Sequence, residues 1–148
     1  MEKVIQTPAA AAKMPRGIRN NNPLNIRKGN NWLGERPNQT DPAFEEFLSM
    51  EYGLRAAFIL LRNYIQGKPP AWIRYNTIEK IIRRWAPETE NATQSYINSV
   101  AKDTGIDPRE VISFSDRRKM VAIVSAMAKV ECGQRIETAV IESAYDLV

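Results

Sequence analysis

The chain has 148 residues, a length typical of one domain with its own hydrophobic core. It contains no histidine and one cysteine, which excludes Ser-His and Cys-His catalysis, histidine-ligated metals and an internal disulfide. The formal net charge of +4 favours anionic partners such as nucleic acid, a membrane surface or a bacterial cell wall. Any catalysis must therefore use carboxylates, lysine, tyrosine, hydroxyls or amides, and we predict neither a metal nor a cofactor.

The N-terminal residues 1–15 are polar and alanine-rich, with little periodicity, and we expect a flexible arm. They lack the pattern of a signal peptide, and no apolar run in the chain approaches the ~20 residues that span a bilayer. We therefore expect a protein that is made in the cytoplasm without a signal peptide or a membrane span. Any work outside the cytoplasm then requires another route of delivery.

Residues 16–49 are rich in Asn, Gly and Pro. Their short apolar pieces, at 24–27, 32–33 and 44–48, are separated by turn signals such as "KGNN" and "PNQTDP". This arrangement predicts a short antiparallel β-hairpin or meander near the N-terminus.

The rest of the chain places apolar residues at helical spacing in five stretches. The predicted helices cover about 49–67, 77–87, 91–105, 115–133 and 136–147, with one further turn at 107–110. Four of them have predicted N-caps, at Ser49, Thr77, Asn91 and Ser115. The fold is therefore predicted to be mainly α (α+β), as a single domain over residues 16–148 with one small β element.

Glu131 interrupts the apolar pattern of the helix at 116–132. It lies four residues after Met127 and seven after Val124, so it shares their core-facing stripe. Partial burial and the helix dipole at the last turn both raise the pKa of a carboxyl group, which is what a general acid needs at neutral pH. The alternative is a frayed helix end with Glu131 in solvent. Cys132 has no histidine to activate it, and we interpret it as structural.

The segments "RGIRNNNPLNIRKGNNWLGE" and "FEEFLSMEYGLRAAFILLRNYI" resemble the lysozyme-like superfamily, in particular flagellar-type glucosaminidases and phage muralytic domains. In that family an Asn-rich strand leads to Trp-x-Gly, a further strand and then a helix. Bacteriophage virion and prophage proteins also carry a segment similar to "WAPETENATQSYI". The resemblance covers about residues 16–133 and implies a small lysozyme-like helical domain.

In the usual order of that family, the helix that ends in the catalytic glutamate precedes the Asn-rich strand. Here the similar helix, "VAIVSAMAKVECG", comes near the C-terminal end. The resemblance therefore implies a circularly permuted domain, in which Glu131 lies beside the Asn-rich strand and protonates a glycosidic oxygen of peptidoglycan. It also implies a substrate-binding role for six residues: Asn21, Asn22, Asn25, Trp32, Thr93 and Tyr96.

Five of these six residues also have a structural interpretation. The asparagines are typical turn formers, and Trp32 and Tyr96 are candidates for the core, as is Trp85 with its isoleucine neighbours. Lytic transglycosylases manage with one catalytic carboxylate, whereas glycoside hydrolysis usually uses two. If a second acid exists, the hairpin offers three, which we interpret as turn or solvent-facing acids: Asp41, Glu45 and Glu46.

Two functions remain open from the sequence. The first is a glycoside hydrolase or lytic transglycosylase that cleaves peptidoglycan glycan strands at the cell wall or periplasm, delivered by a virion or by lysis machinery. The alternative is a non-catalytic phage virion or wall-binding protein that keeps the lysozyme-like fold. Virion components are predicted partners in both. Nucleic-acid binding is not predicted, because the scattered arginines accompany no recognised reader motif.

Overall fold

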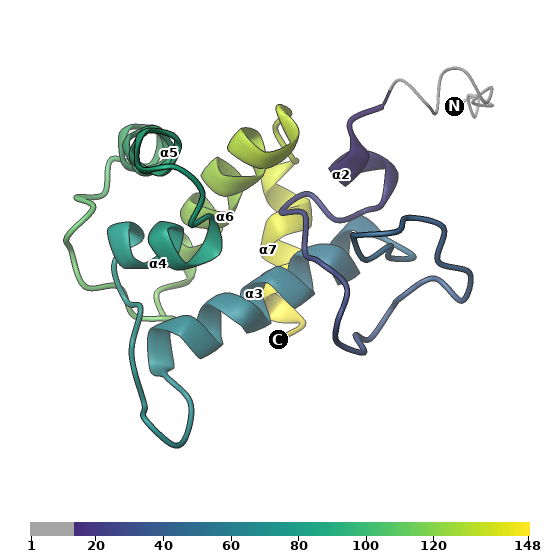
Figure 1. Cartoon of the computed structure of the whole chain (residues 1–148), viewed down its shortest axis with the longest axis horizontal. Helices are drawn as coiled ribbons and strands as arrows, with labels where there is room; N and C mark the ends of the chain where they lie inside the picture. The colour runs from purple at the N-terminus through teal and green to yellow at the C-terminus, as the bar shows by residue number, and fades with distance from the viewer. Residues whose placement is uncertain (1–13) are drawn as a thin grey trace.

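The structure, a computed structural model, describes residues 14–148 and is mainly helical, as predicted. Residues 1–13 of the predicted arm lie outside the described part. In chain order the helices are α2 (Arg16–Arg19), α3 (Met50–Gln66), α4 (Ile78–Trp85), α5 (Glu90–Thr104), α6 (Arg117–Cys132) and α7 (Thr138–Asp146). Figure 1 shows α3 as the long central helix, with α4 and α5 at one end and the segment between α2 and α3 at the other.

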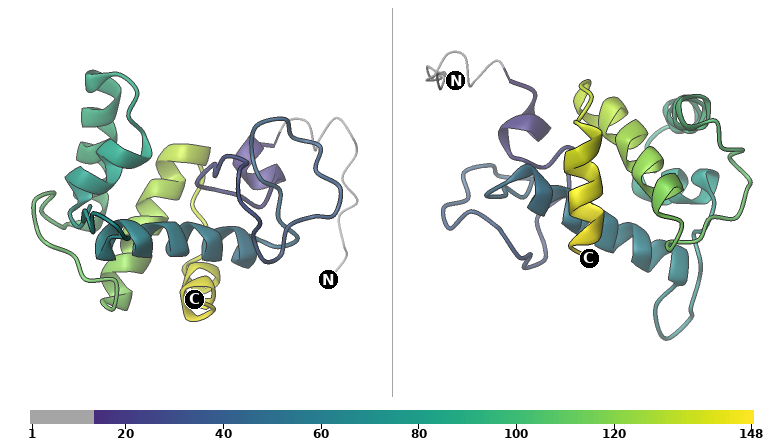
Figure 2. Two further views of the ribbon diagram at one scale, coloured as in Figure 1. Left: turned by 60° about the horizontal axis from the view of Figure 1, so that its bottom comes forward. Right: turned by 180° about the vertical axis from the view of Figure 1, so that it is seen from behind.

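Helix α3 is built as its sequence predicts. The Ser49 hydroxyl accepts a hydrogen bond from the Tyr52 N–H at 3.3 Å, and the apolar face, including Leu54 and Leu61, is completely buried. Helix α7 packs along α3 and α6, as the right-hand view of Figure 2 shows. Phe58 of α3 meets Tyr145 of α7 edge to face, with ring centroids 5.3 Å apart.

Two predicted helix starts are wrong by one or two residues. Helix α5 is capped by Thr89, whose hydroxyl accepts from the Ala92 N–H at 3.2 Å, and not by Asn91. Helix α6 is capped by Asp116, which accepts from the Lys119 N–H at 3.2 Å, and not by Ser115. In each case several neighbouring residues can cap a helix, and the backbone entry angle selects one of them.

We call residues 16–48 the loop half, and residues 50–146 the helical half. In the loop half, the predicted hairpin is reduced to two isolated antiparallel bridges, Arg27–Phe44 and Glu35–Phe47. Asn22 replaces part of the ladder: its Nδ2 donates to the carbonyls of Ile26 and Glu45 at 2.9 and 3.0 Å, and its Oδ1 accepts from the Ile26 N–H at 2.9 Å. A side chain thus satisfies backbone groups that a regular hairpin would pair with one another.

The three hairpin acids are buried, which corrects their interpretation as turn or solvent-facing residues. Asp41, Glu45 and Glu46 are only 6%, 3% and 2% exposed. Asp41 accepts from the Arg16 Nε at 2.6 Å and from Asn20 at 2.9 Å, and the Arg16 guanidinium holds its pKa well below the usual range. A buried carboxylate is tolerated only where it accepts hydrogen bonds, so these side chains determine how the neighbouring chain folds around them.

The other two acids differ in their surroundings. Glu46 accepts from the Thr40 N–H at 2.7 Å and from the Asp41 N–H, and these bonds hold its pKa below the usual value despite burial. Burial raises the pKa of Glu45 to about 7, and the neighbouring Glu35 carboxyl adds to the rise. Both acids therefore belong to the internal structure of the loop half.

The two halves meet at the start of α3. A side chain at Gly53 would place its Cβ 1.7 Å from the Asn21 carbonyl oxygen, so only glycine allows this backbone approach. Within the loop half the Phe47 N–H donates to the Asn20 carbonyl at 2.8 Å, and α2 packs against α6 of the helical half. Among the described helices, none is long and apolar enough to cross a membrane.

Candidate active site

Glu131 lies in the last turn of α6, and Gly133, with a φ of +74°, ends that helix in the left-handed conformation. Its side chain is partly buried, and burial raises its pKa. The negative charge of Glu88 adds to the rise, whereas hydrogen bonding from Asn25, Tyr96 and Trp85 opposes it. The rise expected from the sequence is therefore present, and Glu131 retains its proton at higher pH than an exposed glutamate.

Asn25 brings the loop half into contact with Glu131, although 106 positions separate them in the chain. Its Nδ2 donates to the Glu131 Oε1 at 3.3 Å and lies 3.4 Å from the Glu131 carbonyl oxygen. The backbone of Asn25 has a φ of +54°, a conformation that asparagine tolerates better than most residues. This contact fixes the carboxyl group against both halves of the molecule.

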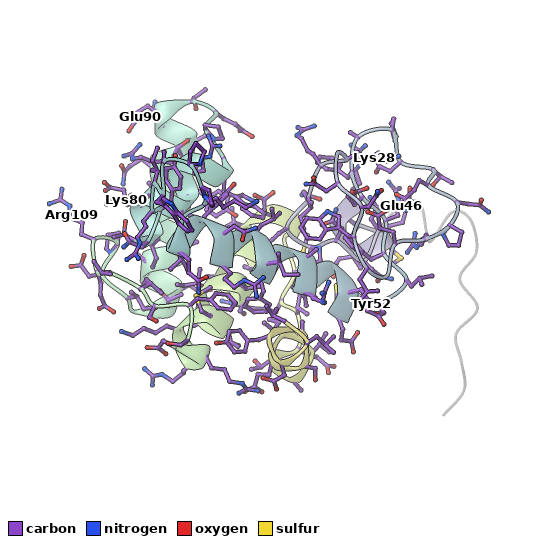
Figure 3. All side chains as sticks on the ribbon, turned by 90° about the horizontal axis from the view of Figure 1, so that it is seen from below. Lys28, Glu46, Tyr52, Lys80, Glu90 and Arg109 are labelled. Atoms are coloured by element: carbon purple, nitrogen blue, oxygen red, sulfur yellow. The ribbon has the colours of Figure 1, made fainter. Side chains whose placement is uncertain are left out.

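Two cavities of about 400 and 390 Å³ share Glu131, Ala86 and Glu88 in their walls, and we call them together the Glu131 cleft. One extends along α5; the other is lined by the loop half and the end of α4. Figure 3 shows side chains of the helical half, near Lys80 and Glu90, facing those near Lys28 across an open gap. A ligand in the cleft would pass on both sides of the Glu131 carboxyl.

Two of the predicted binding residues, Thr93 and Tyr96, line the cleft. The Thr93 hydroxyl donates to the Ala86 carbonyl at 2.8 Å and so holds the turn after α4. The Tyr96 hydroxyl lies 3.5 Å from the Met127 carbonyl, and burial together with the charge of Glu131 raises its pKa well above the usual value. Tyr96 therefore stays protonated and can donate toward Glu131.

Three of the predicted binding residues lie away from the cleft. Asn22 is buried with its amide bonded inside the loop half, and the Asn21 Nδ2 donates to the Phe47 carbonyl at 3.1 Å. Trp32 packs against the core, and its backbone N–H donates to Glu35 at 2.9 Å. The asparagines act as loop formers, which was their alternative interpretation, and only Asn25 of the three reaches Glu131.

Several cleft residues were missed or misjudged from the sequence. Trp85, interpreted as core, does pack against the core, but it is only half-buried and also lines the cleft, where its indole lowers the pKa of Glu131. Glu88, Arg27 and Phe44 complete that wall. The available signal was Pro87, which stops α4 and leaves Trp85 and Glu88 at an exposed turn beside the predicted cleft residues Thr93 and Tyr96.

The chemistry of the cleft is that of a carboxyl group. Cys132 is buried, and burial raises the pKa of its thiol, which disfavours the reactive thiolate. Within residues 14–148, no three side chains of the Cys, Asp or Glu type are grouped so as to hold a metal ion. Glu131 is therefore the group best placed to move a proton.

Comparison with known proteins places the chain among phage proteins. No family model matches it. It is 40% identical over 136 residues to Protein P5 of Pseudoalteromonas phage PM2, an alignment that covers 88% of this chain and 79% of that protein. The chain belongs to the family of Protein P5. The predicted relationship to phage proteins is thereby confirmed.

Proposed function

We propose that this protein is a lysozyme-like enzyme that cleaves the glycan strand of peptidoglycan, with Glu131 as the general acid. One observation carries the proposal: a partly buried carboxyl with a raised pKa lies between two joined cavities and is held by Asn25 from the opposite half. An acid catalyst for a glycosidic bond needs these two properties, a retained proton and a fixed direction.

The proton of Glu131 is delivered to the glycosidic oxygen as the bond to the sugar breaks, and the departing sugar leaves as an alcohol. The sugar carbon left behind bonds to one of its own hydroxyl oxygens in a lytic transglycosylase or to water in a hydrolase, and a carboxylate of the cleft accepts the proton that this oxygen loses. Asn25 acts as a positioning residue, because its amide holds the carboxyl rather than the substrate. The exposed Glu88 is the other carboxylate in the cleft among the described residues. Glu131 alone suffices for a lytic transglycosylase, whereas a hydrolase would also use Glu88 to activate water.

A circularly permuted lysozyme-like domain fits this arrangement. The permuted order requires the helix that ends in the catalytic glutamate to return to the Asn-rich segment near the start of the domain. The contact between Asn25 and Glu131 and the packing of α2 against α6 support that requirement. The net charge of +4 suits an anionic wall.

The test is Glu131→Gln, which keeps the shape of the side chain and removes its acid. We expect at least about a hundredfold loss in the rate at which purified sacculi are cleared, since general acid catalysis is commonly worth that much. Glu137→Gln is the matched control, because Glu137 is exposed and makes no side-chain cap. Wall clearing by Glu131→Gln at the wild-type rate would contradict the proposal.

Mass spectrometry of the released fragments separates the two reactions. A lytic transglycosylase yields an anhydro sugar end, lighter by one water than the hydrolysed end. If the wild-type protein releases no fragments but binds sacculi, it is the alternative, a non-catalytic wall-binding or virion protein. The place of Cys132, where many lysozyme-like relatives have Ser or Asn after the glutamate, is the observation that favours this alternative.

A further inference from the structure

The Glu131 cleft continues into a second region. A cavity of about 210 Å³ shares Asn25, Arg27 and Trp85 with the cleft. A further cavity of about 330 Å³ adjoins it, since both are lined by Leu60 and Tyr64. We call these two cavities the aromatic arm. The shared walls make the arm an extension of the cleft, leading from Glu131 toward the segment after α3.

Aromatic rings form fixed walls in the arm. Tyr64 lies edge to face with Trp85 on one side, at a centroid distance of 6.0 Å, and with Tyr75 on the other, at 5.8 Å. The Tyr75 N–H donates to the Tyr64 carbonyl at 2.7 Å, which ties the segment after α3 back to that helix. Rings that pack on one another in this way are preorganised, so a ligand pays little to order them.

The ionisable groups are sorted along the groove. The acids Glu88 and Glu131 line the cleft, and Arg27 lies in the wall that the cleft and the arm share. The rest of the arm holds the cations Lys68 and Arg84 and no Asp or Glu among the described residues. A neutral polymer would gain nothing from this separation. A ligand whose anionic groups lie to one side of the scissile bond would be attracted to the cationic arm.

Two of these cations are held over aromatic rings. The Arg27 guanidinium lies 4.9 Å from the centre of the Phe44 ring, and the Arg84 guanidinium lies 5.6 Å from that of Tyr75. Neither forms an ion pair with a carboxylate in residues 14–148, unlike Arg16, Arg36, Arg83, Arg117 and Arg135. Stacking on the rings therefore holds the two guanidinium groups in place, and their charge is available to an external anion.

We propose that the aromatic arm binds the carboxylate-bearing peptide stem of peptidoglycan while the Glu131 cleft holds the glycan. The inference rests on the proposed function, and it specifies the substrate as peptide-substituted glycan. The N-acetylated sugars are uncharged, and the carboxylates of the polymer lie on its peptides. An arm that is cationic and free of acids complements the peptide and not the bare sugar chain.

The experiment compares two substrates for Lys68→Gln/Arg84→Gln, which changes the distal part of the arm and leaves the walls of the Glu131 cleft intact. The substrates are intact sacculi and glycan strands stripped of their peptides by an amidase, with the lactyl carboxyl groups that the amidase frees capped as methyl amides. We expect the variant to lose roughly threefold to tenfold in kcat/KM on intact sacculi, the size of two partly solvated ion pairs, and to match the wild type on stripped glycan.

The matched control is Lys102→Gln/Arg118→Gln, which removes the same two charges from exposed positions outside the cleft and the arm. It should behave as the wild type on both substrates. Equal losses for the arm variant on both substrates, or a loss as large in the control, would overturn the inference and leave the glycan-cleaving function standing.

Failure of the proposed function has a different signature, since the wild type would then cleave neither substrate. In that case, titration of the protein with a free stem tetrapeptide, followed by NMR, tests the arm alone. Peptide binding that weakens in Lys68→Gln/Arg84→Gln and not in Lys102→Gln/Arg118→Gln supports the arm. Absence of peptide binding, or binding of a random DNA duplex in its place, overturns it.

Discussion

The helical half buries apolar stripes, whereas the loop half buries carboxylates and amides beside three apolar core residues, Leu24, Ile26 and Phe47. Helices α3 to α6 contribute completely buried residues such as Phe58, Ile81, Ile97 and Ile123, spaced so that each helix presents one apolar face. In the loop half, the buried side chains of Asn22 and Asp41 take a comparable central place. Asn22 bonds to several backbone groups, and Asp41 bonds to both backbone and side-chain groups. Hydrophobic burial is non-directional, but hydrogen bonds specify angles and distances.

This difference matters for the cleft because each half supplies one side of it. Glu131 comes from a helix whose position is set by packing, and Asn25 from a segment with little regular secondary structure. A loop held only by apolar contacts would not fix an amide at 3.3 Å from a carboxylate. The polar network of the loop half therefore stabilises a conformation on which the candidate site depends.

The largest expected effect is at the junction of the halves. In an open helix Gly→Ala stabilises by about 1 kcal/mol. Gly53→Ala should instead lower the free energy of unfolding by more than about 4 kcal/mol, because the new Cβ would lie 1.7 Å from the Asn21 carbonyl oxygen. Urea unfolding followed by circular dichroism measures the change.

Gly105→Ala is the control for this prediction. Gly105 has a φ of +71° with open space around it. Alanine there should lower the free energy of unfolding only through the strain of the left-handed backbone conformation, by about 1–2 kcal/mol. If Gly53→Ala unfolds at the same urea concentration as the wild type, the close approach of α3 to the loop half is not a constraint on the fold.

Removal of Asp41 should selectively weaken the loop half. Asp41→Ala leaves the buried Asn20 amide and the part-buried N–H groups of Ala43 and Phe44 without their acceptor. Each such donor costs about 1–3 kcal/mol, so we expect a loss of at least about 2 kcal/mol. Hydrogen exchange should show faster exchange in residues 20–47 than in α3 and α6. An equal increase in hydrogen exchange across both halves would mean that they unfold as one unit.

The same carboxylate gives the wild-type protein a pH signature. Because the folded-state pKa of Asp41 is lowered, its contribution to stability is present above the unfolded value of about 3.9 and is lost as the pH falls toward the folded value. Asp146, whose pKa is lowered by Arg117 at the surface, is the exposed counterpart in the helical half. In urea unfolding at low pH, Asp146→Asn should change the stability much less than removal of the Asp41 carboxylate does.

The smallest expected effects are two opposite shifts in the pH dependence of wall cleavage. Hydrogen bonding from Asn25 lowers the pKa of Glu131, so Asn25→Gly should raise that pKa and move the alkaline limb to higher pH. The charge of Glu88 raises the same pKa, so Glu88→Gln should move the limb to lower pH. A general acid must be protonated, and its activity therefore falls as the pH rises through its pKa.

Asn21→Gly is the matched control for Asn25→Gly. Both asparagines have a positive φ, which glycine adopts without strain, but the Asn21 amide binds the Phe47 carbonyl away from Glu131. Its pH profile should therefore coincide with that of the wild type. Shifts of the same sign for Asn25→Gly and Glu88→Gln would show that Glu131 is not the titrating group.

The helical half follows from the amino-acid sequence alone. The apolar repeats placed α3 to α7 within a few residues, and the position of Glu131 on a core-facing stripe predicted its raised pKa. Local information was sufficient there because helix periodicity, caps and terminal glycines act over four or five neighbouring residues.

The loop half and the cleft, in contrast, depend on contacts that form when the chain folds. The short helix α2, the burial of Asp41, Glu45 and Glu46, and the choice of Asn25 over Asn21 and Asn22 depend on partners that lie many positions away in the chain. The asparagines are locally similar and differ only in the group that each amide reaches. Directional bonds between distant residues leave no period in the sequence, and so the positions that complete the candidate site become visible only when the chain is folded.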